Sequence, residues 1–340
     1  MSIGYKTLYI NKIKEEIKVE ITRIIAEIKK ERPDVKAVFF VGCGASKAEL
    51  YPAKYFLEER ARTLRASLYT ANEFVHATPA AVNENSIVIT CSLGGNTPET
   101  VEASKKAMAL GAKVIAVTHD GNSPLAQNAH YIIVHGFEAN YAAKQEKAVN
   151  VLALAAEILN QFEGYEDYDR MQDAISKIYD LVEKSVSFVL PNAKQFAKSY
   201  KDDSVIYVMS SGASHEEAYA FSICLLMEMQ WMNSGSFHDG EFFHGPFEIV
   251  DKDVPFILLM NEGKTRALDS RALDFLNRFG AKVTVLDGKD FGLGSELHQS
   301  VVDYFNPIVL SAVLRVYAEQ LAIVRNHPLT KRRYMWKLEY

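Results

Sequence analysis

The strongest constraint on the fold is that the sequence contains one supersecondary unit twice. The tripeptide Gly44-Ala45-Ser46 recurs as Gly212-Ala213-Ser214. Further along the chain, Gly111-Ala112-Lys113-Val114 recurs as Gly280-Ala281-Lys282-Val283 at nearly the same separation. Two matches at almost one offset indicate an internal duplication, and a duplicated unit implies one architecture built twice.

The residues around the repeated words agree in type. In each copy a short apolar run enters a polar loop, a helical stretch follows, and a second apolar run comes next. The apolar runs are Ile87–Thr90 and Val114–Val117 in the first copy, and Pro255–Leu259 and Lys282–Leu286 in the second. Short apolar strands that alternate with amphipathic helices are typical of parallel sheets covered on both faces. We therefore expect an α/β fold of two tandem domains, each a parallel sheet flanked by helices in a flavodoxin-like, three-layer arrangement.

The same pattern sets the expected domain boundaries. We expect an N-terminal helical segment over residues 1–34, a first domain over 35–160 and a second domain over 201–325. A helical linker over 161–200 joins the two domains, and residues 326–340 form a C-terminal tail.

Composition excludes several classes of protein. The formal net charge of −5 provides no global basic field for nucleic acid or for a membrane surface. The three cysteines lie in apolar stretches without a CxxC pair, which predicts buried, reduced thiols and no metal site. No stretch approaches the roughly 20 apolar residues of a membrane span, and the charged N-terminus is unlike a signal peptide. We expect a cytoplasmic protein without nucleic-acid or membrane partners.

Two polar loops of the first copy predict a phosphate site. In parallel α/β sheets, ligands bind at the carboxyl ends of strands, where helix N-termini favour an anion. The hydroxyls of Ser46, Ser92 and Thr97 can donate to phosphate oxygens. Gly94 lets the backbone approach closely. Taken singly, Ser46 and Thr97 are each better explained as helix N-caps, but two such loops on neighbouring strand ends favour an anion site.

A dinucleotide site is a remote alternative for the first of these loops. Gly42-Cys43-Gly44 has the Gly-x-Gly beginning of that fingerprint, and Glu73 is a candidate ribose ligand. Lys47 occupies the third glycine position, which weakens the match.

Glu228 is a carboxylate within an apolar helical stretch. Its helical neighbours are all apolar, so a solvated face does not explain it; they are Cys224, Leu225, Trp231 and Met232. Burial of an unpaired carboxylate is costly and raises its pKa toward neutrality, as a general base or acid requires. An ion pair with a Lys or Arg from elsewhere, or exposure at an interface, explains Glu228 equally well.

A glycine-punctuated aromatic loop follows Glu228. It contains Gly240-Glu241-Phe242-Phe243-His244-Gly245-Pro246. This pattern, and the interval between Glu228 and His244, resemble the catalytic loop of the sugar isomerase (SIS) domain family. The loop Ser92–Thr97 resembles the phosphate loop of that family, with Gly94 where the family has a serine. The resemblance covers nearly the whole chain as two SIS domains, similar to the isomerase half of glutamine–fructose-6-phosphate amidotransferase.

This resemblance implies roles for two residues. Glu228 would move a proton between C1 and C2 of a sugar phosphate. His244, contributed by the partner subunit of a dimer, would open the sugar ring. The resemblance therefore implies a homodimer, or a higher assembly, with a shared active site over which the C-terminal tail folds. No metal or redox cofactor is implied, because the substrate carbonyl is the electron sink.

Longer elements narrow the resemblance. Gly240–Glu248, Glu163–Tyr165 and Arg332–Tyr340 look like the deglycases of phosphorylated Amadori compounds. Such an enzyme is a hydrolase of a C–N bond. The resemblance implies hydrolysis of a 6-phosphofructosyl amino acid, of the 6-phosphofructose-aspartate or fructoselysine 6-phosphate type, to glucose 6-phosphate and free amino acid.

The basic tail bears on which amino acid is released. Arg333 and Lys337, with Lys331 and Arg332, are candidates for contacts with the amino acid or within the tail. In sequence, Lys337 lies near, but not at, the position that corresponds to the catalytic lysine of the amidotransferase. An acidic aglycone would be favoured by this charge, so we expect aspartate rather than lysine. Packing of the tail on a partner subunit explains the cluster equally well.

Two other classes of function stay open. An aldose–ketose or amino-sugar phosphate isomerase uses the same proton transfer without hydrolysis. A non-catalytic phosphosugar sensor needs only the phosphate loops, and it gives no reason to bury Glu228.

Overall fold

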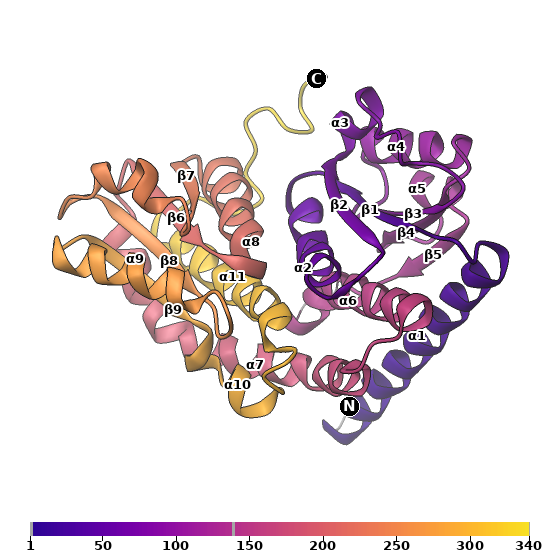
Figure 1. Cartoon of the computed structure of the whole chain (residues 1–340). Helices are drawn as coiled ribbons and strands as arrows, with labels where there is room; N and C mark the ends of the chain where they lie inside the picture. The colour runs from indigo at the N-terminus through magenta and orange to yellow at the C-terminus, as the bar shows by residue number, and fades with distance from the viewer. Residues whose placement is uncertain (1–2, 138–139, 340) are drawn as a thin grey trace. The chain divides into compact units, whose positions relative to one another are not determined.

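The computed structural model describes the backbone of residues 3–137 and 140–339, and side chains from residue 16 onward (Figure 1). The chain divides into two compact units, Met1–Ser176 (unit 1) and Lys177–Tyr340 (unit 2). This division falls inside the linker expected over 161–200, and the finer domain boundaries stay a prediction.

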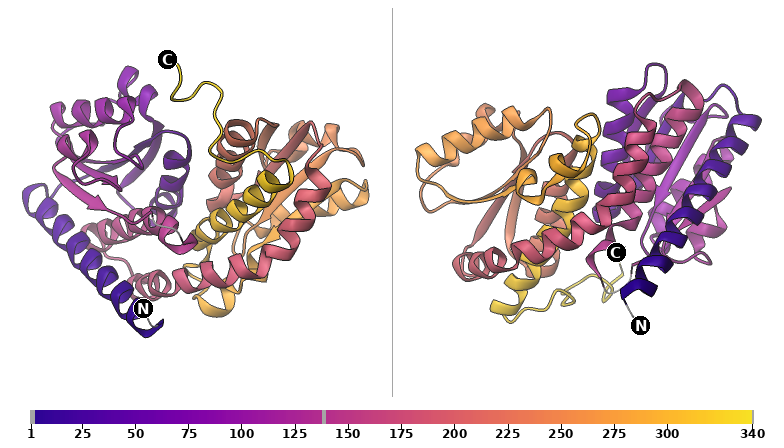
Figure 2. Two further views of the ribbon diagram at one scale, coloured as in Figure 1. Left: turned by 180° about the vertical axis from the view of Figure 1, so that it is seen from behind. Right: turned by 90° about the horizontal axis from the view of Figure 1, so that it is seen from below.

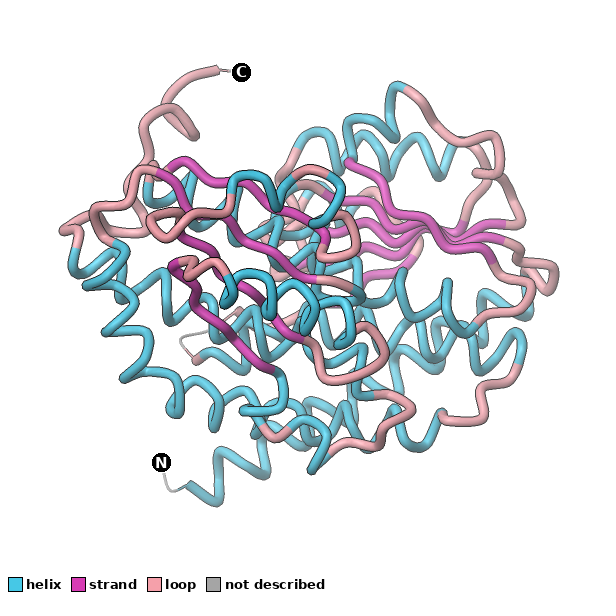
Figure 3. The backbone as a smooth tube through the Cα atoms, turned by 60° about the vertical axis from the view of Figure 1, so that its left-hand side comes forward, coloured by secondary structure: helices cyan, strands magenta, loops and turns pink. Residues whose placement is uncertain are grey.

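Unit 1 contains a sheet of five parallel strands in the order β2-β1-β3-β4-β5, as labelled in Figure 1. Figure 3 draws the strands of the protein in magenta. Both β1 and β3 are buried at every position, as inner strands covered on two faces should be. The strands are β1 (Ala37–Gly42), β2 (Arg65–Thr70), β3 (Ser86–Cys91), β4 (Lys113–Thr118) and β5 (Tyr131–Val134).

Helices cover both faces of this sheet (Figure 2). On one face α2 packs against α6, and α6 packs against α1, whereas α3, α4 and α5 lie on the other face. The helices are α1 (Ile3–Glu31), α2 (Gly44–Arg60), α3 (Ala71–His76), α4 (Pro98–Ala109), α5 (Pro124–Gln127) and α6 (Tyr141–Glu163). The expected three-layer arrangement is therefore confirmed for this unit.

Unit 2 repeats the architecture with four parallel strands in the order β7-β6-β8-β9. This is the order of the first four strands of unit 1, so the duplication expected from the sequence is present in the topology. The strands are β6 (Val205–Ser210), β7 (Asn233–His238), β8 (Pro255–Met260) and β9 (Lys282–Asp287).

The helical elements of unit 2 also form two layers. α9 packs on β8, whereas α8, η2 and α11 pack against one another on the other face. The α-helices are α7 (Tyr168–Tyr200), which begins in unit 1, α8 (His215–Ala220), α9 (Arg266–Arg278), α10 (Leu293–Glu296) and α11 (Asn306–Val324). η2 (Phe221–Met229) is a π-helix, and the 3-10 turns are η1 (Gly212–Ser214), η3 (Phe242–His244), η4 (Pro246–Ile249), η5 (Gly288–Phe291) and η6 (Val302–Phe305).

One motif that narrowed the family resemblance has a structural role in unit 1. Gly164 ends α6 with a positive φ of 79°. The Glu163 carboxylate accepts hydrogen bonds from the backbone N–H groups of residues 62, 63 and 64, at 2.7, 2.9 and 2.7 Å. Tyr165 packs edge-on against Phe56, with ring centroids 5.2 Å apart. Glu163–Tyr165 therefore ties α6 to the start of β2.

Helix α11 corrects one expectation. The segment Val302–Val324 is long and apolar enough to cross a membrane by length and composition, although no such segment was expected. In the structure 67% of its apolar window is buried inside the protein. Its face toward the core contains Leu310, Val313 and Tyr317, and Tyr317 packs edge-on against Phe196 of α7. The apolar run is thus used for packing within unit 2.

Candidate active site

The two hydroxyl loops of unit 1 lie on adjacent strands. β1 and β3 pair in parallel, and Gly42 at the end of β1 is opposite Cys91 at the end of β3. β1 leads into α2, whose first turn contains Ser46, and β3 leads into Ser92–Thr97 before α4. Parallel pairing therefore brings the two loops to one edge of the sheet.

Helix capping does not explain the hydroxyls of these loops. Cys43, not Ser46, is the N-cap residue of α2. Thr97 is the N-cap residue of α4, but its side chain makes no capping bond. Its hydroxyl instead lies 2.9 Å from the hydroxyl of Ser92. Two hydroxyls at one sheet edge, neither of them capping a helix, suit an anionic ligand.

A buried lysine contacts the hydroxyl of Ser46. Lys147 of α6 is only 4% exposed. Its Nζ lies 3.1 Å from Ser46 Oγ and also forms an ion pair with Glu49. Because the Ser46 oxygen accepts a bond from Lys147, its own proton can be donated to another acceptor. Lys147 was not predicted as a site residue; the apolar helix that follows it was the one available signal.

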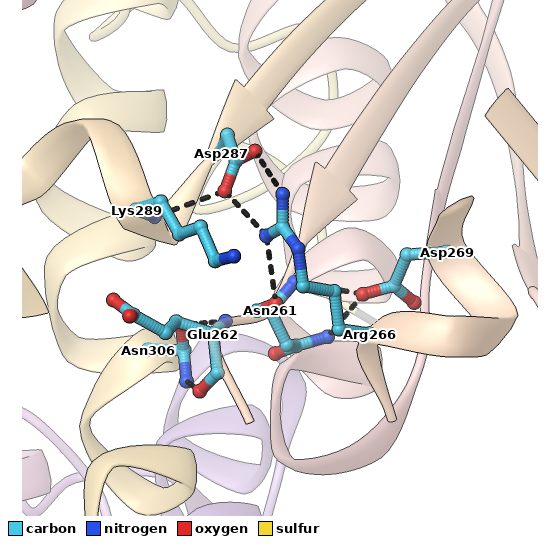
Figure 4. Close-up of polar contacts among 7 residues, drawn as sticks. All are labelled: Asn261, Glu262, Arg266, Asp269, Asp287, Lys289 and Asn306. Atoms are coloured by element: carbon cyan, nitrogen blue, oxygen red, sulfur yellow. Dashed lines mark hydrogen bonds and ion pairs between the residues drawn. The ribbon is translucent and has the colours of Figure 1, made fainter. Parts of the chain in front are cut away.

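The equivalent loop of unit 2 is filled by the chain itself (Figure 4). The N–H of Glu262 donates to Asn306 Oδ1 at 2.8 Å, and the N–H of Lys264 donates to Asp303 Oδ1 at 2.9 Å. Between them, Gly263 has a φ of +148°, and a Cβ there would lie 1.9 Å from Asp303 Oδ1. These backbone donors are already used, so they are not available to a phosphate.

One ion pair and one further hydrogen bond reinforce the filled loop. Arg266 forms a bidentate pair with Asp287, at 2.7 and 2.6 Å (Figure 4). The backbone N–H of Asn261 donates to Asp269 at 2.7 Å. The two copies thus share a backbone architecture but differ in what occupies the loop after the second inner strand.

Glu228 lies on the π-helix η2, not on the regular helix that we expected. The helix ends at Met229, and Trp231 beyond it has a positive φ of 54°. π-helical segments occur frequently at functional sites. Trp231 and Met232 are therefore not helical neighbours of Glu228, although they line the same pocket.

Arg332 is the partner of Glu228, so the ion-pair alternative of the sequence analysis is confirmed. Its Nη2 lies 2.7 Å from Glu228 Oε1, and the two side chains are 8% and 22% exposed. Burial raises the pKa of Glu228, and Arg332 offsets part of that rise, so the pKa stays above its usual value. Arg332 was noted in the basic tail, but its contact with Glu228 was not predicted.

A pocket of about 580 Å³ surrounds this ion pair within unit 2. Arg333 belongs to its lining, whereas Lys337 donates from Nζ to the backbone oxygen of Arg332 at 2.7 Å. Of the two proposed tail contacts, Arg333 therefore faces the pocket and Lys337 holds the tail. The lining consists of Met227, Glu228, Trp231, Met232, Asn233, Arg332, Arg333, Tyr334 and Met335.

His244 lies apart from this pocket. It ends the turn η3 after β7 and is exposed. The turn itself is anchored by Phe242, which is fully buried, and by Phe243, whose ring lies 4.1 Å from the Arg271 guanidinium. No contact between His244 and Glu228 occurs among the described residues. This placement fits a histidine that acts on a partner subunit, which stays a prediction.

A buried carboxyl pair lies at the base of the loop that carries His244. Asp239 is 2% exposed, and its backbone N–H donates to Ser210 at 2.9 Å. Asp269, beside it, accepts hydrogen bonds from Ser211 and Asn261. Burial, and then the neighbouring Asp269, raise the pKa of Asp239 to about 10. Asp239 is therefore protonated at neutral pH and can donate to Asp269. No role was predicted for Asp239 from the sequence.

No metal centre is evident within residues 16–137 and 140–339, where no group of three His, Cys, Asp or Glu side chains gathers.

Comparison with known proteins gives the following relatives. A SIS domain is matched over residues 34–155. The chain is 44% identical over 303 residues to the fructosamine deglycase FrlB of Bacillus subtilis (strain 168), covering 89% of this chain and 92% of that protein. It is 24% identical to the fructoselysine 6-phosphate deglycase of Escherichia coli (strain K12), covering 88% and 86%.

Two solved structures are also similar to this chain. A crystal structure from Salmonella typhimurium LT2, named as a phosphosugar isomerase, has a TM-score of 0.92 at 44% identity, covering 95% of this chain and 97% of that one. The C-terminal domain of a glucosamine-fructose-6-phosphate aminotransferase from Francisella tularensis has a TM-score of 0.75 at 18% identity, covering 92% and 95%, and shares the fold.

The carboxyl pair gives a pH-dependent prediction for stability. Asp239 binds its proton more tightly in the folded state, so its contribution to stability falls as pH rises from about 4 toward 10. An asparagine side chain at this position cannot lose a proton, and its amide can still donate to Asp269. We expect Asp239→Asn to match the wild type near pH 5 and to exceed its free energy of unfolding by about 1 kcal/mol or more at pH 8. Urea unfolding at both pH values measures this.

The control for this experiment is Asp274→Asn, which changes an exposed carboxylate of α9. Its effect should be the same at both pH values. A difference between Asp239→Asn and wild type that does not grow with pH would contradict the buried, protonated pair.

Proposed function

The chain belongs to the family of SIS-domain fructosamine deglycases, and on this premise we propose that it hydrolyses a 6-phosphofructosyl amino acid to glucose 6-phosphate and the free amino acid. The observation on this chain that carries the proposal is Glu228, a half-buried carboxylate with a raised pKa in a pocket. A general base with a pKa nearer neutrality is what proton abstraction beside a carbonyl needs.

The proposed reaction moves one proton and then adds water. The substrate is a ketoamine, with nitrogen on C1 and a carbonyl at C2. Glu228 removes a proton from C1 while the C2 oxygen is protonated, which gives an enolamine. Glu228 then returns its proton to C2, and the nitrogen loses a proton as the C1 imine forms. C1 is oxidised as C2 is reduced, so no redox cofactor is required, and water hydrolyses the imine to the aldehyde and the free amine.

Unit 1 supplies the proposed phosphate site. Ser46, Ser92 and Thr97 would donate hydroxyl protons to the 6-phosphate, and the backbone of Gly94 would approach it. Support comes from the adjacent strand ends, the absence of side-chain capping at Thr97, and Lys147 behind Ser46. The filled loop of unit 2 argues that phosphate binding belongs to the first copy alone.

His244 would assist opening of the cyclic fructosyl form at the site of a partner chain. Its exposure, on a turn whose two phenylalanines are packed, supports such a role. We therefore propose a homodimer, or a higher assembly, with shared active sites. The three cysteines form no disulfide, which fits the cytoplasmic location that we propose.

The cations of the C-terminal tail bear on which amino acid would be released. Lys331 lies over the ring of Trp231, Arg332 binds Glu228 and Lys337 holds the tail backbone. Arg333 is the tail cation that lines the pocket without a carboxylate partner among the described residues. Our preference for aspartate over lysine therefore rests on Arg333.

The first test is Glu228→Gln. The amide has the shape of the carboxylate but cannot accept the C1 proton, so kcat should fall by about 10²–10⁴-fold while substrate still binds. The assay follows glucose 6-phosphate and free amine from 6-phosphofructosyl-aspartate and from fructoselysine 6-phosphate. Glu102→Gln, an exposed carboxylate of α4, is the matched control.

Fructose 6-phosphate is the second substrate in this assay. Turnover of fructose 6-phosphate without amine release from either ketoamine would favour the isomerase function that the Salmonella structure is named for. A loss of less than about tenfold in Glu228→Gln would mean that Glu228 is not the base.

A mixing experiment tests the shared site. We expect His244→Ala to lose most activity, and we expect a mixture of His244→Ala and Glu228→Gln chains to recover part of it. Each mixed dimer would contain one site with both native groups. Native mass spectrometry confirms that subunits have exchanged. If mixed dimers form and no activity returns, the histidine does not act across the interface.

The phosphate site is tested with Ser92→Ala. A hydroxyl bond to a phosphate contributes about 1.5–3 kcal/mol, so KM should rise about tenfold or more. The phosphate does not change during proton transfer, so kcat should change less. Inhibition by inorganic phosphate should weaken in parallel. Ser176→Ala, whose hydroxyl donates to Asp173, serves as the control. A loss confined to kcat would place the phosphate elsewhere.

A further inference from the structure

Successive residues of the C-terminal tail contact two different side chains of unit 2, Trp231 and Glu228. Lys331 and Arg333 lie over the ring of Trp231, at 4.8 and 4.4 Å from its centroid. Arg332, between them in sequence, reaches Glu228 at 2.7 Å. Because both of its neighbours in sequence are held against the Trp231 ring, the backbone at Arg332 is held where its side chain reaches the carboxylate.

Trp231 is held in a conformation that a bulky residue rarely adopts. Its φ of 54° places it in the left-handed region, directly after the π-helix that carries Glu228. His327 meets its ring edge-on, with centroids 4.5 Å apart. Backbone strain of this kind persists only where the surrounding contacts maintain it. The position of the Trp231 ring is thus fixed from both the helix and the tail.

Arg332 is fixed more firmly than a surface ion pair would require. It is 8% exposed, and its Nη1 donates to the backbone oxygens of Leu329 and Lys331, at 2.6 and 3.0 Å. Its guanidinium also lies 5.1 Å from the centroid of the Trp336 ring. Exposed ion pairs contribute little because both side chains stay mobile, and these contacts remove that mobility.

We propose that Arg332 is a positioning residue for Glu228, and that Trp231 is the anchor on which the tail docks to deliver it. The proposal rests on the proposed role of Glu228 as the base. The ion pair to Oε1 fixes the carboxylate and favours its ionised form, which leaves Oε2 to accept the C1 proton. A carboxylate buried without this cation would take up a proton and lose its function as a base.

Arg332 is the charged group that acts on Glu228 in the described part of unit 2. The elements α8, β6, β7 and α11 pack against η2. Their titratable and charged groups make no contribution to the pKa of Glu228, whereas Arg332 lowers it against the effect of burial. These groups are Tyr207, His215, Glu216, Glu217, Tyr219, His238, Arg315, Tyr317 and Glu319.

The test is the pH dependence of kcat in Arg332→Gln. Without the cation the pKa of Glu228 should rise, so the acid limb of the profile should move up by about one pH unit or more. Activity at pH 7 should fall about tenfold or more and partly return at higher pH. Arg332→Lys restores the charge and should keep the limb near its wild-type position. Trp231→Leu should shift the limb as Arg332→Gln does, because the tail loses its anchor.

Arg278→Gln is the matched control, since it removes an exposed cation stacked on Phe279 in the same unit. An unshifted acid limb in Arg332→Gln, or equal losses in Arg278→Gln, would overturn the proposal. Carbon-13 NMR titration of Glu228, assigned with Glu228→Gln, gives the same pKa comparison without turnover. A wild type inactive on every ketoamine would refute the deglycase, whereas an unchanged carboxylate titration in Arg332→Gln would refute the positioning role.

Discussion

Parallel strands covered on both faces send every strand-to-helix connection over the same edge of the sheet, and the chemistry of this protein depends on that constraint. In unit 1 the pairing of β1 with β3 brings the loop containing Ser46 beside Ser92–Thr97. In unit 2 the ends of β6, β7 and β8 bring Ser211, Asp239 and Asn261 into one buried network around Asp269. Side chains that are far apart in sequence become neighbours because the parallel register places the ends of these strands at the same edge of the sheet.

The two copies use this shared edge differently. Unit 2 fills its loop with oxygens of Asp303 and Asn306, so its backbone donors are satisfied internally. Unit 1 has hydroxyls at the corresponding edge, with Lys147 behind Ser46. The two copies therefore share a strand order, but the unit 2 loop uses its backbone N–H groups within the fold, whereas the unit 1 edge presents the hydroxyls that we propose to bind phosphate. The proposed carboxylate chemistry belongs to unit 2, which contains Glu228.

Much of the fold could be predicted from the sequence because it depends on local pattern. The strands β3, β4, β8 and β9 follow from apolar runs and from their alternation with helical stretches. The π-helix η2 did not follow, because a π-helix has the composition of an α-helix. Its register depends on packing against β7, α8 and α11.

By itself the sequence determined the duplication, the layered α/β class, the loops of Ser46 and Ser92–Thr97, and the anomaly of an apolar helix with Glu228 in it. The tertiary structure decided what those residues contact. Arg332 is far from Glu228 in sequence, and only the folded tail brings their charges to 2.7 Å. Lys147 and Ser46 are likewise brought together only by the tertiary structure, and so are Asp239 and Asp269. Local pattern specifies where a side chain is placed on an element, whereas burial and pairing depend on which distant elements pack against it.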